Sequence, residues 1–138
     1  MALTGSLFKD KQMTYIYSAS IKEKFQKDLY IKKKLSIGHN NTPWKPKVNI
    51  LLKKIVVELK DTASGSGNSV IRLYNNYGQG SQQIIYDASF ASNDASQETS
   101  SVFSFAVQAG SEITYGITQV TSNDPGGEAI ISFIYENA

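Results

Sequence analysis

The stretch Ile55-Val-Val-Glu-Leu-Lys60 indicates most clearly which fold the sequence favours. Successive side chains of a strand point to opposite faces of a sheet, so Ile55, Val57 and Leu59 would share one face. The other face would carry a glutamate and a lysine. Such alternation is typical of an antiparallel strand that is buried on one side and solvated on the other. The stretch therefore predicts a half-buried strand within the longer apolar run Val48–Leu59.

The same alternation recurs along the chain and predicts about eight strands. They are Gln12–Ile21, Asp28–Ile37, Val48–Leu59, Ser69–Tyr77, Gln82–Asp87, Ser101–Val107, Glu112–Gln119 and Ala129–Glu136. Segments rich in glycine, asparagine and proline separate them, and we interpret one, Asn123-Asp-Pro-Gly-Gly-Glu128, as a tight hairpin turn. Many short strands without helical spacing between them predict an all-β fold, an antiparallel β-sandwich or jelly roll.

The lysine-rich segment that follows the first predicted strand fits two structures. Ile21, Phe25 and Leu29 are spaced by four residues, which predicts a short helix over residues 21–29. A strand is equally compatible, and lysines towards the end of this segment would suit an edge strand, where they discourage unwanted pairing. Both alternatives stay open at this point.

The chain has 138 residues, of which 41% are hydrophobic, and no cysteine. This length suits one domain with one core. The absence of cysteine excludes a disulfide scaffold, a thiolate zinc site and a cysteine nucleophile. No apolar run reaches the roughly 18 residues needed to span a bilayer, and Met1–Lys11 lacks the apolar core of a signal peptide. We therefore expect neither a transmembrane segment nor a signal peptide.

Charge is divided unevenly along the chain. Residues 1–60 contain 13 of the 14 basic residues and carry a net charge of +9, whereas residues 61–138 carry −7. We expect residues 1–47 to form a basic N-terminal arm that packs on or docks the domain, and residues 48–138 to form the sandwich core. Opposite charges on the two halves favour head-to-tail contact between copies, which salt would weaken.

The residues predict no catalytic centre, no metal site and no cofactor. His39 is the only histidine and lies in a turn segment, where a surface loop position is expected. Gly65-Ser-Gly67 and Gly78-Gln-Gly80 lie between strands and do not open a helix, so they would not cradle a phosphate. A carboxylate pair of the glycosidase type stays open, because separation in space is not visible in a sequence. We expect a protein that is not an enzyme.

Two groups of residues are candidates for binding a partner. A lysine cluster favours an acidic protein or nucleic acid, although a solvated face is an equal interpretation. Aromatic residues in loop-like stretches could anchor a partner or stack on a sugar ring, and Trp44, which lies between two prolines, could instead pack on the core. The candidates are Lys22, Lys24, Lys27, Lys32, Lys33, Lys34, Trp44, Tyr74 and Tyr77.

The strands expected at Asn49–Leu59 and Ser69–Tyr74, the segment Phe103–Tyr115 and the closing strand Glu128–Tyr135 resemble the small β-sandwich proteins of tailed-phage virions. The resemblance covers Val48–Ala138 and lies in rhythm and composition. It implies a non-enzymatic virion protein, made in the host cytoplasm, that serves as an auxiliary capsid, head-fibre or collar and tail component. Such a protein would form homo-oligomers and dock to other virion proteins, with nucleic acid less favoured and no membrane contact. The alternative is a carbohydrate- or receptor-binding sandwich module.

Overall fold

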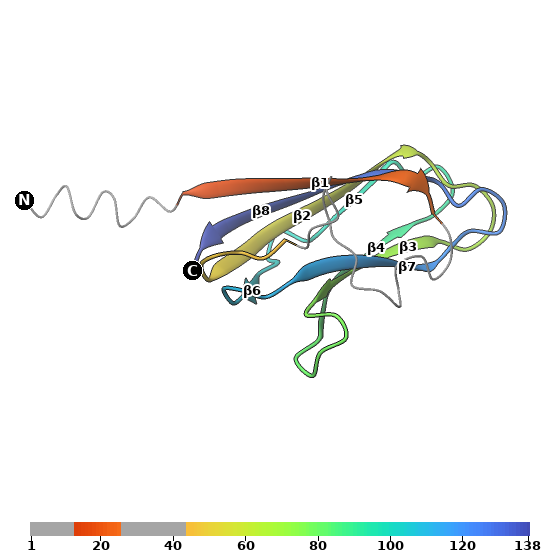
Figure 1. The fold of residues 1–138 in the computed structure, drawn as a ribbon. Helices are drawn as coiled ribbons and strands as arrows, with labels where there is room; N and C mark the ends of the chain where they lie inside the picture. The colour runs from red at the N-terminus through yellow and green to blue at the C-terminus, as the bar shows by residue number, and fades with distance from the viewer. Residues whose placement is uncertain (1–12, 26–43) are drawn as a thin grey trace, which may run out of the picture.

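A computed structural model describes residues 13–25 and 44–138. This part of the chain contains eight strands and no helix (Figure 1). The strands are β1 (Thr14–Lys24), β2 (Ile50–Asp61), β3 (Ser69–Asn75), β4 (Gln83–Phe90), β5 (Ser96–Glu98), β6 (Phe105–Val107), β7 (Ile113–Gln119) and β8 (Gly127–Asn137). The predicted all-β fold class is confirmed.

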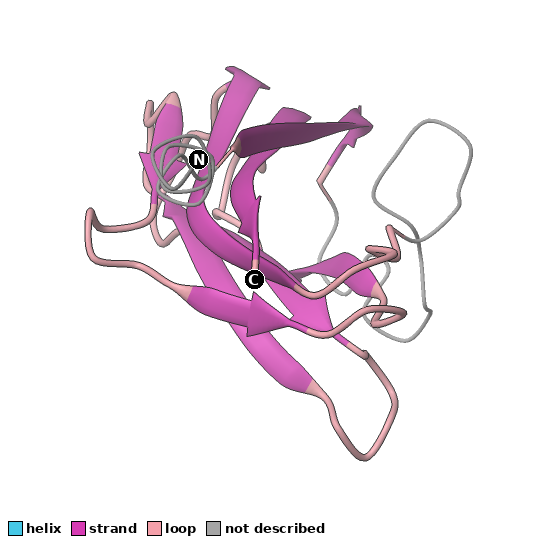
Figure 2. Cartoon of the chain, turned by 90° about the vertical axis from the view of Figure 1, so that its left-hand side faces the viewer, coloured by secondary structure: helices cyan, strands magenta, loops and turns pink. Residues whose placement is uncertain are grey.

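The strands form two antiparallel sheets that face each other (Figures 1 and 2). Sheet A has the order β1-β8-β2-β5, and β6 also pairs with β2; sheet B has the order β4-β3-β7. The long strand β2 pairs with β8 along one edge, and along the other edge it pairs with β6 near its start and with β5 near its end. Most connections pass from one sheet to the other, so the loops gather at the two ends of the sandwich.

The hydrophobic core lies between the sheets, as the alternation in β2 predicts. Ile55 and Val57 are fully buried, whereas Glu58 and Lys60 are exposed. Phe133 of β8 and Leu73 of β3 are also fully buried, one from each sheet. The inward face of every long strand therefore supplies side chains to a single core.

Two features of the N-terminal region bear on the sequence predictions. Residues 21–24 belong to β1, so the structure supports the strand alternative there, and the pairing of β1 with β8 places residues 14–24 at the edge of sheet A. Residues 26–29 of the alternative helix and the predicted strand Asp28–Ile37 lie outside the described residues.

The predicted hairpin turn at Asn123–Glu128 is wrong. This segment leaves β7 in sheet B and enters β8 in sheet A, so it joins the two sheets and not two neighbouring strands. It is held by backbone hydrogen bonds between Asp124 and Ser64 and by donation from the Phe25 N–H to the Gly126 carbonyl. Turn residues fix the local backbone conformation, but the strand on which the chain pairs next depends on distant residues.

Candidate functional site

Lys24 lies in a cluster of ion pairs at one end of the sandwich. Its Nζ is 2.8 Å from Asp61 Oδ2 and 2.8 Å from Asp124 Oδ1. The carboxylates raise the pKa of Lys24 to about 12, chiefly through the hydrogen bond to Asp124 and then through that to Asp61. The same hydrogen bond from Lys24, followed by one from the Gly126 backbone N–H, holds the pKa of Asp124 below its ordinary value. The cluster thus links the end of β1 to the end of β2 and to the β7–β8 loop.

These shifts predict how the contribution of the cluster to stability depends on pH. Asp124 has a lowered pKa, so its contribution is present above about pH 4 and is lost as the carboxylate becomes protonated. Lys24 has a raised pKa, so its contribution is present below its ordinary value of 10.5 and is lost as pH rises towards about 12. We therefore expect Asp124→Asn to lower the free energy of unfolding at neutral pH, and we expect this loss to become smaller as the pH falls from 4 to 3.

Urea unfolding of both proteins between pH 3 and pH 11 measures this difference. Asp94→Asn is the matched control, because within the described residues Asp94 has no lysine partner like that of Asp124. Its carboxylate accepts hydrogen bonds from uncharged donors, the Ala91 backbone N–H and the side chain of Gln97. A gap between the wild type and Asp124→Asn that stays constant from pH 7 to pH 3 would contradict the assigned role of the charge.

Some of the other predicted lysines lie within the described residues and some lie outside them. Lys22 is exposed on β1, on the side of sheet A that faces away from sheet B. Lys27, Lys32, Lys33 and Lys34 lie outside the described residues. Of the predicted lysine cluster, the structure therefore places only Lys22 and Lys24, and it assigns Lys24 to contacts within the chain.

Trp44 packs against the core and also contributes to the surface. Its ring stacks on Tyr17, with centroids 4.3 Å apart and planes 5° apart, and it contacts Phe133 and Tyr135 at centroid distances of 5.2 and 5.3 Å. Its backbone carbonyl accepts a hydrogen bond from the N–H of Ile113. The part of the ring that stays exposed lines a groove of about 330 Å³. The structure thus supports the packing alternative for Trp44, and its role as a binding anchor stays a prediction.

The two predicted tyrosines lie elsewhere in the sandwich. Tyr74 of β3 contacts Tyr77 in the following loop, with ring centroids 4.7 Å apart. Tyr74 is only 3% exposed, and burial raises the pKa of its hydroxyl. Trp44, in contrast, contacts rings of β1 and β8 in sheet A. The predicted aromatic residues therefore do not form one site. Tyr74 contributes mainly to packing, and Tyr77 keeps partial exposure.

Sequence reasoning missed a partly apolar surface, the outward side of sheet A, which carries two exposed isoleucines. Alternation and register place the same side chains of three neighbouring strands on this side. We call this surface the outer face. Its residues are Ile16, Ser18, Ser20 and Lys22 on β1; Glu128, Ile130, Ser132, Ile134 and Glu136 on β8; and Lys54, Val56, Glu58 and Lys60 on β2.

The outer face has an apolar and hydroxyl-bearing centre with charges around it. Ile16 is 68% exposed and Ile130 is 46% exposed, which is unusual for isoleucines in paired strands. Between them, the hydroxyls of Ser18 and Ser132 lie 3.4 Å apart. The outer face carries three lysines and three glutamates, so its net charge is zero. The sequence signal was present in β8, where consecutive residues such as Ile130 and Ile131 are apolar and must point to both faces.

In the described ranges, no three His, Cys, Asp or Glu side chains lie close enough together to hold a metal ion. The same ranges contain no helix that is long and apolar enough to cross a membrane.

The fold is similar to that of two phage capsid structures. The capsid asymmetric unit of cyanophage Pam1 aligns with a TM-score of 0.56 and 8% identity, covering 94% of this chain and 88% of that chain. The acid-stable capsid of the Helicobacter pylori bacteriophage KHP30 aligns with a TM-score of 0.52 and 10% identity, covering 91% and 93%. No family model and no curated protein matches the sequence. At such identities the likeness concerns the fold, and it confirms the resemblance in architecture to phage structural proteins.

Proposed function

We propose that this protein is a non-enzymatic structural component of a phage virion that associates with copies of itself and docks to another virion protein. The fold similarity to two phage capsid structures supports the virion role. An auxiliary capsid protein is the form we favour, and a head-fibre or collar and tail component is the related alternative. The observation that carries the assembly role is the outer face of sheet A, with its exposed isoleucines.

A second copy of the chain is the occupant that we propose for the outer face. Exposed apolar side chains that share one face of a protein often mark an interaction surface. The charges around them are balanced, so lysines of one copy can face glutamates of another without a partner of opposite net charge. A hollow of about 290 Å³ beside Ile130, between Lys22 and Lys60, offers space for a side chain of the neighbouring copy.

The solution mass of the full chain tests this assembly directly. We expect a discrete oligomer by light scattering, and we expect Ile130→Lys to raise its dissociation constant at least about 30-fold, because a central apolar contact would be replaced by a charge. Ile84→Lys is the matched control, since Ile84 lies on β4 of sheet B and has a similar exposure of 49%. High salt should weaken the oligomer without abolishing it, because the charges surround an apolar centre.

Two results would overturn the assignment of the outer face. One is a wild-type protein that stays monomeric at all concentrations and salt levels. The other is equal dissociation by Ile84→Lys and Ile130→Lys. The virion role has its own test, which is detection of the protein by mass spectrometry in purified particles of the phage that encodes it. Absence of the protein from intact particles would exclude this role.

We further propose that the basic N-terminal segment contacts an acidic virion protein. Lys22 lies on the outer face and belongs to the contact with the second copy, so it is not assigned to this partner. Lys24 already pairs with Asp61 and Asp124, which reduces the positive charge offered to a polyphosphate. An acidic protein surface is the partner that we propose, with nucleic acid as the less favoured alternative.

A further inference from the structure

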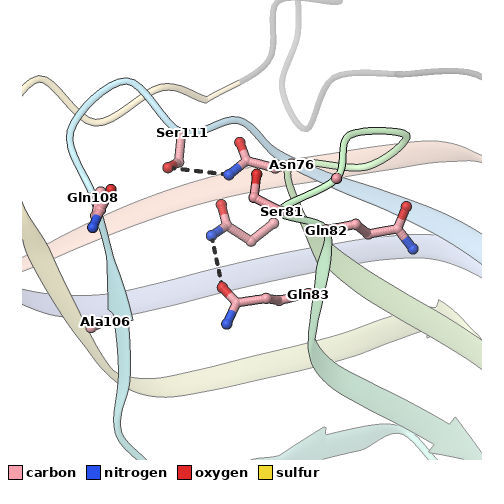
Figure 3. A pocket seen from close by; sticks show the side chains of 9 residues that line it. Asn76, Ser81, Gln82, Gln83, Ala106, Gln108 and Ser111 are labelled. Carbon is pink, nitrogen blue, oxygen red and sulfur yellow. Dashed lines mark hydrogen bonds between the residues drawn. The ribbon is translucent and has the colours of Figure 1, made fainter.

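A cavity of about 550 Å³ opens at one end of the sandwich, between the β3–β4 connection and the segment from β6 to β7 (Figure 3). None of its nine lining residues carries a charge. Five are asparagines or glutamines, two are serines, and the others are a glycine and an alanine. The cavity wall therefore presents many hydrogen-bond donors and acceptors and no ionisable group.

Asn75, one of the residues that line the cavity, has a buried carbonyl oxygen whose hydrogen bond is unmade. It is the last residue of β3 and is 4% exposed. Its Nδ2 lies 3.4 Å from Gln83 Oε1, whereas its Oδ1 has no hydrogen-bond partner. In the part of the chain that the structure describes, only Thr114 Oγ1 is also buried and unpartnered, and Thr114 does not line the cavity. A buried acceptor without a donor costs free energy. This oxygen is closed to solvent, so an O–H or N–H group of a bound molecule would remove the cost once the carboxamide of Asn75 turns towards the cavity.

The wall of the cavity is held in place by hydrogen bonds between its two loops. Asn76 donates its backbone N–H to the Glu112 carbonyl at 2.8 Å and accepts the Glu112 N–H on its Oδ1 at 3.1 Å. Its Nδ2 also forms a hydrogen bond of 3.5 Å with Ser111 Oγ. Figure 3 marks this bond with a dashed line. Across the loop, the Gly78 N–H donates to Gln82 Oε1 at 2.8 Å. A ligand would therefore enter a cavity that is already formed, which lowers the entropic cost of binding.

We propose that this cavity binds a neutral carbohydrate. Sugar hydroxyls both donate and accept hydrogen bonds, which matches a wall of carboxamides and serine hydroxyls. An ion would find no opposite charge in the wall, and an apolar ligand would leave the amides unpaired. The volume of the cavity is within the range of small-molecule sites.

NMR spectroscopy of the full-length protein provides the test. We would titrate ¹⁵N-labelled protein with glucose, galactose, N-acetylglucosamine and lactose, and follow the side-chain amides of Asn75, Gln83 and Gln108. We expect saturable shifts of these amides with at least one sugar. The affinity should be equal at pH 5 and pH 8 and at low and high salt, because no charged group lines the cavity.

Two variants and a control locate the site. Gln108→Ala removes one neutral hydrogen-bonding group from the wall and should weaken binding about three- to tenfold. Asn75→Leu should abolish binding with little change in the melting temperature, because it removes a buried, unpaired carbonyl oxygen together with one long hydrogen bond to Gln83, and the side chains are of similar size. Gln119→Ala, an exposed glutamine of β7 outside the cavity, should bind normally.

Absence of saturable shifts with all four sugars would overturn the proposal. So would sugar-induced shifts that are confined to the groove beside Trp44, or binding that survives both Gln108→Ala and Asn75→Leu.

Discussion

Replacing Phe133 with alanine is expected to lower the free energy of unfolding by about 3–5 kcal/mol. Phe133 is fully buried in β8, and its register partners are Tyr17 of β1 and Ile55 of β2. Its ring also contacts Trp44 at a centroid distance of 5.2 Å. Truncation would leave a cavity where three strands and the Trp44 segment meet, so little relaxation can fill the space.

Urea and thermal unfolding at several protein concentrations would measure this loss. For a domain of this size, we expect the melting temperature to fall by roughly 10–20 °C. Phe133→Leu is the matched control, because it keeps most of the apolar volume and should cost less than about 1.5 kcal/mol. A loss below about 1 kcal/mol for Phe133→Ala would contradict the position of the ring at the centre of the core.

The strands were predictable because their signal is local. Alternation in β2 identifies both the strand and its buried face, and the long runs on β1, β3, β4, β7 and β8 were found in the same way. The three-residue strand β5 was missed, since Ser96–Glu98 carries no alternation and becomes a strand only by pairing with Val56–Glu58 of β2. The β7–β8 connection was misread for a related reason, because its turn residues do not indicate which sheet receives the next strand.

The candidate sites were less predictable because they depend on residues far apart in the chain. Lys24 was predicted to face a partner, yet Asp61 and Asp124 meet it only after sheet A and the β7–β8 loop have formed. The outer face combines three strands whose order is not visible in the sequence. The unpartnered oxygen of Asn75 depends on the position of the β6–β7 segment, which lies more than 30 residues further along the chain.

Replacing Gly126 with alanine is expected to lower the free energy of unfolding by about 2–5 kcal/mol. Gly126 has a φ of +77°, which is unfavourable for alanine. An added Cβ would lie 2.8 Å from the Asp61 carbonyl oxygen and 3.0 Å from the Ala63 nitrogen. Both neighbours are backbone atoms and cannot rotate away as a side chain would, so the loop itself would have to move.

Gly126→Ala has two costs, the unfavourable positive φ and the steric contact of the added Cβ with backbone atoms. Gly110→Ala separates them, because Gly110 has a φ of +82° but no atom within 4 Å of an added Cβ. Gly110→Ala should lower the free energy of unfolding only by the cost of the positive φ, about 1–2 kcal/mol. The further loss in Gly126→Ala then measures the steric contact with backbone atoms at Gly126. Movement of the loop would also disturb the hydrogen bonds that Gly126 makes with Phe25 and Asp124. We therefore expect Gly126→Ala to reduce the pH-dependent contribution of Lys24 and Asp124, whereas Gly110→Ala should leave it unchanged. An equal decrease in the free energy of unfolding for the two alanine variants would show that the β7–β8 loop moves at little cost. Its contact with the end of β1 would then contribute little to stability.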